Sequence, residues 1–241
     1  MALIGSTPPP RRGIPGLFTG FLMLLGPVLA WLGVVQPLVG FALFALGGFA
    51  GLVLGLVVLG RAVRGRGITR GGVVAVLTGI AFVVIAARGV GTPRINDFTT
   101  DLDDAPVFRN PATLPANQGR DLRYPTVFVA VQRGCCPDLH PARLRGSTDD
   151  AFARARLVAE GMPTWTITAA DPAAGTIEAT ATSRVFRFVD DIVIRVRPDG
   201  GGQSRVNVRS KSRDGKGDIG ANAARIRQYI EALEATATDR P

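Results

Sequence analysis

The acidic residues of this chain are confined to its second part, and the first part contains one very long uncharged stretch. Residues 1–92 hold seven arginines and no aspartate or glutamate, and Gly13–Gly60 is a run of 48 residues without a charge. A single helix of that length would span roughly 72 Å, whereas the hydrocarbon core of a bilayer is about 30 Å thick. The run therefore predicts two membrane-spanning helices.

We expect the break between these helices at Gln36-Pro37, because proline lacks a backbone donor and disfavours a helical predecessor. This gives spans at about residues 14–35 and 38–60. A third uncharged stretch of 17 residues, 71–87, lies between Arg70 and Arg88. A buried helix of a soluble domain is its alternative interpretation, because 17 residues are at the short end of the spanning range. We expect a third span, so that residues 1–92 form a membrane region.

The arginines predict the orientation of this region. With three spans, two clusters fall on one side of the membrane: Arg11 and Arg12, and Arg61, Arg64, Arg66 and Arg70. Short arginine-rich loops stay in the cytoplasm. The sequence thus predicts a protein of the bacterial inner (cytoplasmic) membrane whose C-terminal domain is extracytoplasmic. Without the third span, that domain would lie on the opposite side.

Three glycines in the second span, Gly47, Gly51 and Gly55, recur at four-residue spacing. This spacing lets another helix backbone approach closely. Packing against the other spans of the same chain is the favoured interpretation, and a homo-oligomer through these glycines is the alternative. The predicted spans contain no Asp, Glu, Lys or His. Ion and proton pathways use such residues, so a transporter is not expected.

The net charge of +9 does not indicate a nucleic-acid-binding protein. Residues 1–92 contribute +7, and the remainder contributes +2 from 21 Lys+Arg against 19 Asp+Glu. A surface that follows a phosphate backbone needs a concentrated excess of positive charge. The nearly balanced second part lacks it, so no nucleic-acid partner is expected.

The second part is predicted to contain a loop-rich lead segment, residues 93–146, and an α+β domain, residues 147–237. Thr126–Gln132 is a possible strand in the lead segment. Ser147 is a suitable helix cap with Asp150 three residues later, and Gly161 and Pro163 end that helix. Alternating residues, turn signals and a final apolar helical face predict four strands and a second helix. The expected strands lie near residues 164–168, 176–182, 188–196 and 204–212, and the second helix begins at about Asp218.

The order α-β-β-β-β-α predicts an antiparallel sheet with helices packed on one side, because short connections favour neighbouring antiparallel strands. Several segments carry a resemblance to a known family: Phe188–Arg195, Val208-Arg209-Ser210, Ser212-Arg213, Gly217–Ile226, and Ile95-x-Asp97-x-Thr99-Thr100-Asp101. On these residues, the chain from roughly Ile95 to Leu233 resembles the bacterial and plastid family known as domain of unknown function 1499. The resemblance implies a fold and the place of a site, but no reaction. The family often has an aromatic residue before a Pro-Asp step near residue 137, where this chain has Cys136.

Asp190 and Asp191 resemble a catalytic pair, but adjacent strand residues point to opposite faces of a sheet. Asp190 shares its face with Phe188, Ile192 and Ile194. A carboxylate buried there needs a partner, for which Arg184, Arg209, Arg213 and Arg225 are the candidates. A structural ion-pair network is the favoured interpretation. The alternative is an envelope hydrolase that uses Asp190 or Asp191 as acid or base.

A pocket for an anionic or polar ligand is the functional interpretation of the same region. Ser210 and Ser212 share one strand face, and Arg209, Lys211 and Arg213 share the other. Glycines surround the start of the last helix, where free N–H groups favour anions, although Asp218 could cap that helix itself. The candidate ligand-binding residues are Arg184, Asp190, Arg209, Ser210, Ser212, Arg213, Asp218, Asn222 and Arg225.

Cys135, Cys136 and His140 suggest a metal site, but adjacent cysteines lack the usual spacing of zinc ligands. A vicinal disulfide or a bridge between chains is the competing interpretation outside the cytoplasm. We expect no catalytic residue, metal or cofactor. The chain is thus predicted to be a membrane-anchored binding or assembly module for an anionic ligand or an envelope protein. The alternatives are the hydrolase and a thiol or metal role for the two cysteines.

Overall fold

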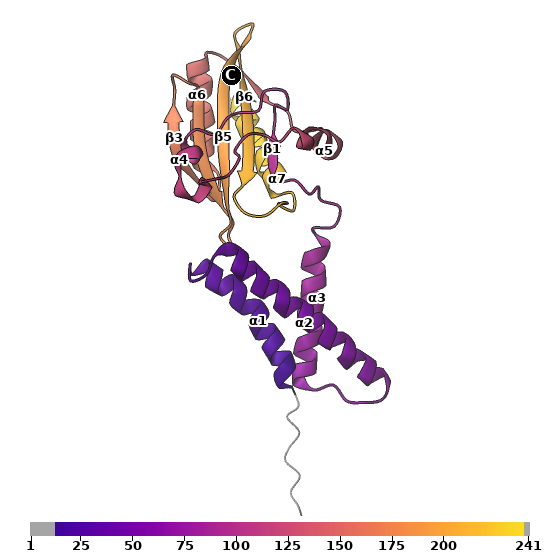
Figure 1. Cartoon of the computed structure of the whole chain (residues 1–241). Coiled ribbons are helices and arrows are strands. Elements are labelled where there is room, and N and C mark those ends of the chain that lie inside the picture. Colours follow the sequence, from indigo (N-terminus) through magenta and orange to yellow (C-terminus); the bar gives the residue numbers. More distant parts are fainter. Residues whose placement is uncertain (1–12, 239–241) are drawn as a thin grey trace, which may run out of the picture. The chain divides into compact units, whose positions relative to one another are not determined.

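The computed structural model describes residues 13–238, and the chain divides between Val90 and Gly91 into two compact units (Figure 1). The first unit consists of three apolar helices, α1 (Ile14–Trp31), α2 (Pro37–Val63) and α3 (Arg70–Ala87). Each of them is long and apolar enough to cross a membrane. The three predicted apolar helices are therefore present.

The helix boundaries follow local sequence signals. α2 begins with Pro37 at the predicted break, after Gln36 in extended backbone. α1 ends at Trp31, earlier than expected, because the following residues form a turn in which Gly33 has a φ of 71°. Arg11 and Arg12, which contributed to the predicted orientation, lie outside the described residues.

The glycines of α2 pack inside this unit. A Cβ added to Gly47 would lie 2.4 Å from the Met23 backbone nitrogen of α1, and one added to Gly51 would lie 2.6 Å from the Thr78 side chain of α3. Gly55 likewise faces the α3 backbone, at 3.1 Å from Val76 Cα. Intrachain contacts therefore use the face that a homo-oligomer through these glycines would require.

The second unit is an antiparallel sheet with helices packed on it, so the predicted α+β class is confirmed. Five strands lie in the order β1-β6-β5-β4-β3, and the short β2 also pairs with β6. The strands are β1 (Asp97–Thr99), β2 (Ala142–Arg145), β3 (Trp165–Asp171), β4 (Thr176–Thr182), β5 (Val189–Gly200) and β6 (Gln203–Ser212). The glycine-rich step at residues 200–202, with all three φ values positive, makes the tight turn between β5 and β6.

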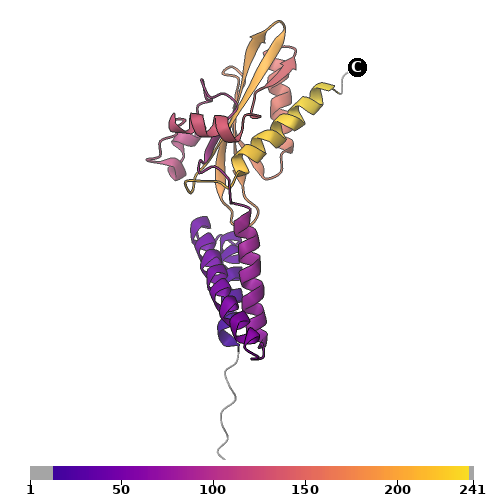
Figure 2. The ribbon, with the colours of Figure 1, turned by 90° about the vertical axis from the view of Figure 1, so that its right-hand side faces the viewer.

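Two long helices, α6 (Thr148–Gly161) and α7 (Ala221–Thr238), cover one face of the sheet (Figure 2). Ser147 caps α6 as predicted, since its side chain accepts a hydrogen bond from the Asp150 backbone at 3.1 Å. The hydrophobic core lies between the helices and the sheet, and Ile192, Ile194 and Ile226 are fully buried in it.

The lead segment covers the other face of the central strands. Its helical pieces include α4 (Asn110–Thr113) and η1 (Pro115–Asn117), which are both short. The Glu178 carboxylate of β4 holds the start of α4, because it accepts hydrogen bonds from the backbone nitrogens of Arg109 and Asn110 at 2.6 and 2.8 Å. Charged strand residues therefore anchor this covering layer.

The strand predicted at Thr126–Gln132 is wrong, because this segment forms the helix α5 (Val127–Cys135) beside β1 (Figure 1). The buried Gln132 side chain explains the difference. Its amide accepts from the Thr99 backbone nitrogen at 3.1 Å and donates to the Thr99 carbonyl at 2.5 Å. A helix side chain therefore supplies β1 with the hydrogen bonds that a neighbouring strand would provide.

Candidate functional site

In the structure, the nine residues predicted to bind a ligand lie at three different locations. Strand alternation puts Ser210 and Ser212 on the helix-covered face of β6 and puts Arg209 and Arg213 on the face under the lead segment. Asp190, Asp218, Asn222 and Arg225 join the two serines on the helix-covered face. Arg184 makes none of these contacts and lines a surface groove beside α7, which Arg225 also lines.

On the helix-covered face, Arg225 of α7 is the centre of the contacts. Its guanidinium donates to Asp190 Oδ2 at 2.7 Å, to Asn222 Oδ1 at 2.7 Å and to Ser210 Oγ at 3.0 Å. Asn222 in turn donates to Ser212 Oγ at 2.8 Å. Asp190 therefore pairs with one of its four candidate partners, and the pair joins the sheet to α7 as the ion-pair interpretation predicts.

The start of α7 is capped by its own sequence. The Asp218 carboxylate accepts from the backbone nitrogens of Gly220 at 2.9 Å and Asn222 at 2.6 Å. Burial raises the pKa of this carboxyl above its usual value, while the two backbone donors act in the opposite direction. The donors that an anion would use at this helix start are therefore engaged by Asp218.

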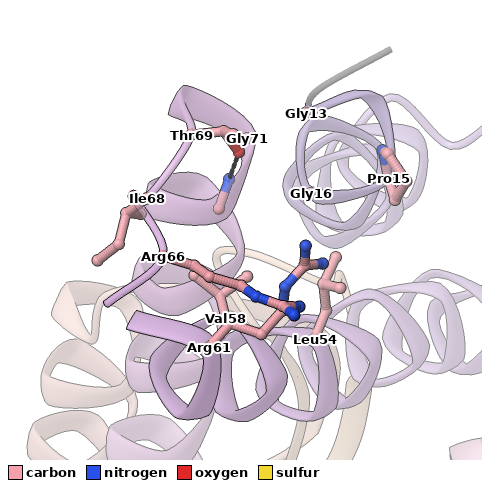
Figure 3. Close-up of a pocket in the computed structure, with 12 residues that line it drawn as sticks. Gly13, Pro15, Gly16, Leu54, Val58, Arg61, Arg66, Ile68, Thr69 and Gly71 are labelled. Carbon is pink, nitrogen blue, oxygen red and sulfur yellow. Dashed lines mark hydrogen bonds between the residues drawn. The ribbon is translucent and has the colours of Figure 1, made fainter. Parts of the chain in front are cut away.

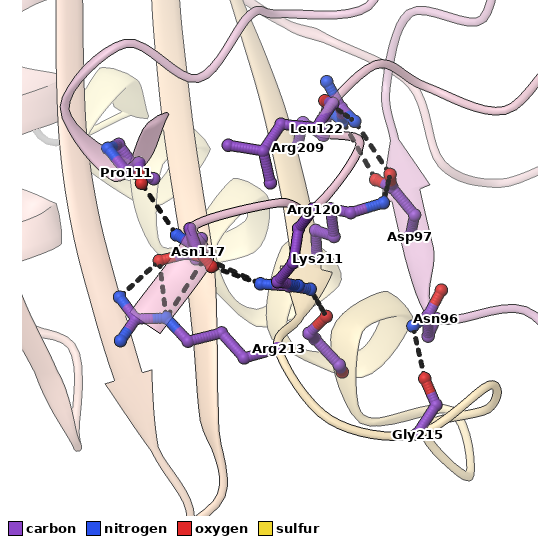
Figure 4. A network of polar contacts seen from close by, with 12 residues as sticks. Asn96, Asp97, Pro111, Asn117, Arg120, Leu122, Arg209, Lys211, Arg213 and Gly215 are labelled. Atoms are coloured by element: carbon purple, nitrogen blue, oxygen red, sulfur yellow. Dashed lines mark hydrogen bonds and ion pairs between the residues drawn. The ribbon is translucent and has the colours of Figure 1, made fainter. Parts of the chain in front are cut away.

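Under the lead segment, Arg209 is almost completely enclosed, with 1% of its surface exposed. Its guanidinium binds both oxygens of Asp97, at 2.9 and 2.7 Å, and Lys211 binds the same carboxylate at 2.9 Å (Figure 4). The rings of Phe108 and Tyr124 lie against it, at 4.6 and 5.6 Å from their centroids. This arginine has no face left for a ligand.

Arg213 and Asp191 form a second enclosed pair on the same face. Arg213 Nη2 donates to Asp191 Oδ1 at 2.6 Å, and the Asn117 amide donates to Asp191 Oδ2 at 2.9 Å (Figure 4). Arg120 lies 3.8 Å from the same carboxylate and donates to the Ser212 carbonyl at 2.6 Å. The pair therefore fastens the lead segment to the sheet.

These contacts bear on the hydrolase hypothesis. It requires a carboxylate that lies free of arginine partners in a cleft. Asp190 and Asp191 are both buried, and each is paired with an arginine within 2.7 Å. Neither is the free acid or base that such a mechanism needs.

The groove beside α7 has different properties. It has a volume of about 310 Å³ and lies between the starts of β3 and α7 and the end of β4. Arg184 and Trp165 line it together with Arg225 and Gln228. Arg184 is exposed and makes no ion pair with the described residues. Thr164, also in the lining, has a φ of 71°, a backbone conformation that is strained for a β-branched residue.

Comparison with protein families identifies a matching family. The family model described as "Protein of unknown function (DUF1499)" matches residues 97–233. The chain belongs to this DUF1499 family. No curated protein matches the chain.

The family match begins at Asp97, the buried acid that pairs with Arg209. The segments on which the resemblance was recognised also supply Asp190, Asp191, Arg209 and Arg225, which form the paired clusters on the two faces. Most of the recognisable polar residues of this domain are therefore engaged with one another inside the fold.

The two cysteines lie at the end of α5. Their sulfur atoms are 2.7 Å apart, and both are free thiols. Burial, with a contribution from the neighbouring Cys136, raises the pKa of Cys135 to about 12. No group of three or more metal-ligating side chains occurs within residues 13–238, and His140 is exposed.

The site predicted from the sequence lacks several residues that lie under the lead segment or in the groove beside α7: Asp97, Asn117, Arg120, Lys211, Trp165 and Gln228. Asp97 and Lys211 had a usable signal, because Asp97 is in the family pattern and Lys211 alternates with the serines. Asn117 and Arg120 had none, since they come from an irregular segment whose path no periodicity fixes.

Proposed function

We propose that α1–α3 anchor the chain in the bacterial cytoplasmic membrane and that the DUF1499 domain lies outside the cytoplasm. The support is the distribution of charge, because the described loop between α2 and α3 carries Arg64 and Arg66, and the first acidic residue is Asp97. Short arginine-rich loops are retained in the cytoplasm, and α3 then takes the following chain across.

A reporter fused to the C-terminus tests this orientation. An alkaline phosphatase fusion, which is active only after export, should show activity, and a fluorescent protein that folds only in the cytoplasm should not. The reverse pattern would overturn the orientation.

In this setting, the domain works as a binding module for a small anionic ligand. The observation that carries the proposal is the exposed Arg184 in the groove, which forms no ion pair with the described residues. Arg225 lies in the same lining but is paired with Asp190, so Arg184 is the arginine that is free to make the direct contact. Trp165 adds an apolar wall. A carboxylate or phosphate attached to a small apolar group matches this combination.

The groove contains a natural reporter of binding. The chain has two tryptophans, Trp31 in α1 and Trp165 in the groove. In a Trp31→Phe background, the fluorescence of Trp165 is measured while phenyl phosphate, or inorganic phosphate as the smaller anion, is added to the detergent-solubilised full chain. We expect a saturable change with phenyl phosphate.

The matched variants are Arg184→Gln and Arg187→Gln, which remove the same charge from two exposed positions three residues apart. Loss of a charged hydrogen bond should weaken binding about tenfold or more in Arg184→Gln. Arg187 does not line the groove, so its variant should bind like the parent. Equal affinities for the two variants, or no saturable signal with either anion, would exclude this site.

A further inference from the structure

The membrane unit contains a pocket of about 650 Å³, and all of its lining residues belong to this unit. It lies between the first turn of α1, the last turns of α2 and the loop that leads into α3 (Figure 3). Arg61 of α2 and Arg66 of the loop are its charged lining residues. The pocket is therefore at the end of the helical unit where the arginines are gathered.

Neither arginine has a countercharge in this unit. The sequence contains no acidic residue before Asp97, and the described residues of the unit provide no ion pair for Arg61 or Arg66. Arg64 differs, because it donates to the Gly60 carbonyl at 3.1 Å at the end of α2. Figure 3 shows the Arg61 and Arg66 side chains reaching toward the same space. Two like charges in one pocket favour occupation by an anion.

The lining changes from charged to apolar along α2. Arg61, Val58 and Leu54 are three and seven residues apart, so they share one face of the helix and cover roughly 10 Å of its length. Ile68 and Pro15 add apolar surface on the other sides. A phospholipid changes in the same direction, from its phosphate to its acyl chains, when it lies beside a membrane-spanning helix.

Close contact between two helix starts shapes this pocket. A Cβ on Gly16 would lie 1.8 Å from the Gly71 carbonyl oxygen, so α1 and α3 approach to a distance that only glycine permits. At Gly67, in contrast, an added Cβ would meet no atom within 4 Å. The pocket therefore has a fixed wall on the side of α1 and α3, and space remains beside the loop.

We propose that this pocket binds an anionic phospholipid, with Arg61 and Arg66 donating to the headgroup phosphate and the wall of Val58 and Leu54 contacting the beginning of an acyl chain. Pairs of arginines bind phosphate through short, charge-assisted hydrogen bonds, and basic pockets at the ends of membrane helices suit lipid headgroups. The proposal rests on the membrane insertion of α1–α3 in the proposed function, and it is independent of the Arg184 groove.

The test uses the full chain in a mild neutral detergent. Native mass spectrometry counts bound lipid while phosphatidylglycerol, phosphatidylcholine or inorganic phosphate is added. The pocket variant is Arg61→Gln/Arg66→Gln. The matched control is Arg64→Gln/Arg70→Gln, which removes the same charge from the same loop region at positions outside the pocket lining. Circular dichroism confirms that both variants keep their helices.

We expect the wild type to bind phosphatidylglycerol at least tenfold more tightly than phosphatidylcholine. The pocket variant should lose at least this factor, while the control stays within about twofold of wild type. Equal loss in both variants would show general attraction to positive charge and overturn the site. Displacement by inorganic phosphate with no preference between the lipids would overturn the lipid assignment. Failure of the Arg184 experiment would leave these results unaffected, so the two proposals are tested separately.

Discussion

At the scale of single residues, Asp97 compensates two buried cations. It holds Arg209 and Lys211, which are 1% and 6% exposed, through contacts of 2.7 to 2.9 Å. Removing one partner of a buried pair leaves a charge without compensation, which costs about 3–5 kcal/mol. We therefore predict that Asp97→Ala lowers the free energy of unfolding of the second unit by about this amount, measured by urea denaturation followed at Trp165.

The control for this prediction is Asp121→Ala, because Asp121 pairs with Arg123 on an exposed part of the same lead segment. Exposed pairs add little to stability, so its midpoint should match that of wild type. If Asp97→Ala unfolded at the same urea concentration as Asp121→Ala, the buried triad would not stabilise the domain.

Asp218 provides a second prediction, in which pH is the variable. Burial raises the pKa of this carboxyl in the folded state. The stability that the neutral Asp218 carboxyl contributes is therefore fully present at a pH below the pKa of this group in the unfolded chain. It is lost as the pH rises through the pKa of the group in the folded protein. Asp218→Asn keeps a capping oxygen without a charge. Its free energy of unfolding relative to wild type should increase as the pH rises from about 4 to about 7, measured by paired urea titrations. A difference that does not vary with pH would contradict this.

The sequence predicts part of the arrangement of these side chains. Strand alternation correctly separates Asp190 from Asp191, and Ser210 from Arg209. It cannot select the partner of Asp190 among four arginines, because that choice depends on the rotation and position of α7 over the sheet. The partners of Asp191 are even harder to predict from the sequence, since Asn117 comes from a segment without periodicity.

At the scale of elements, glycine decides how closely α2 packs. A methyl group on Gly47 would lie 2.4 Å from a backbone atom of α1, which no side-chain rotation can relieve, whereas at Gly60 of the same helix the nearest atom is 3.7 Å away. We predict that Gly47→Ala lowers the melting temperature of the helical signal in detergent. Gly60→Ala should keep or raise it, because alanine favours a helix by up to about 1 kcal/mol over glycine. Equal melting temperatures for the two variants would contradict this prediction. They would show that α1 and α2 can move apart at Gly47 without a loss of stability.

The elements differ in how well the sequence predicts them. The sequence predicts α6 and the hairpin of β5 and β6 because their signals are local: Ser147 caps the helix, and consecutive glycines make the turn. Local signals do not predict α5, because its valines and Phe128 favour a strand by intrinsic preference. The deciding contact, between Gln132 and Thr99, joins residues 33 positions apart.

At the scale of the whole molecule, charge is used differently in the two units. The first unit has arginines and no acid, so its arginines have no countercharge within the unit. The second unit has nearly equal numbers of both signs and places many of them in pairs between its layers. The family match, residues 97–233, falls within the second unit, which accords with a domain that has its own core.

The last prediction concerns the separation of these units. Arg88 and Arg94 are exposed on either side of the boundary at Val90 and Gly91, and the core of the second unit is composed of residues that follow Arg94. Trypsin added to right-side-out spheroplasts should therefore release a folded fragment that begins near Ile95 and no longer sediments with the membrane. Arg88→Gln/Arg94→Gln should suppress this release, because exposed linkers are cleaved faster than packed elements. Release from inverted vesicles alone would instead reverse the proposed orientation, since the protease would then reach the boundary only from the cytoplasmic side.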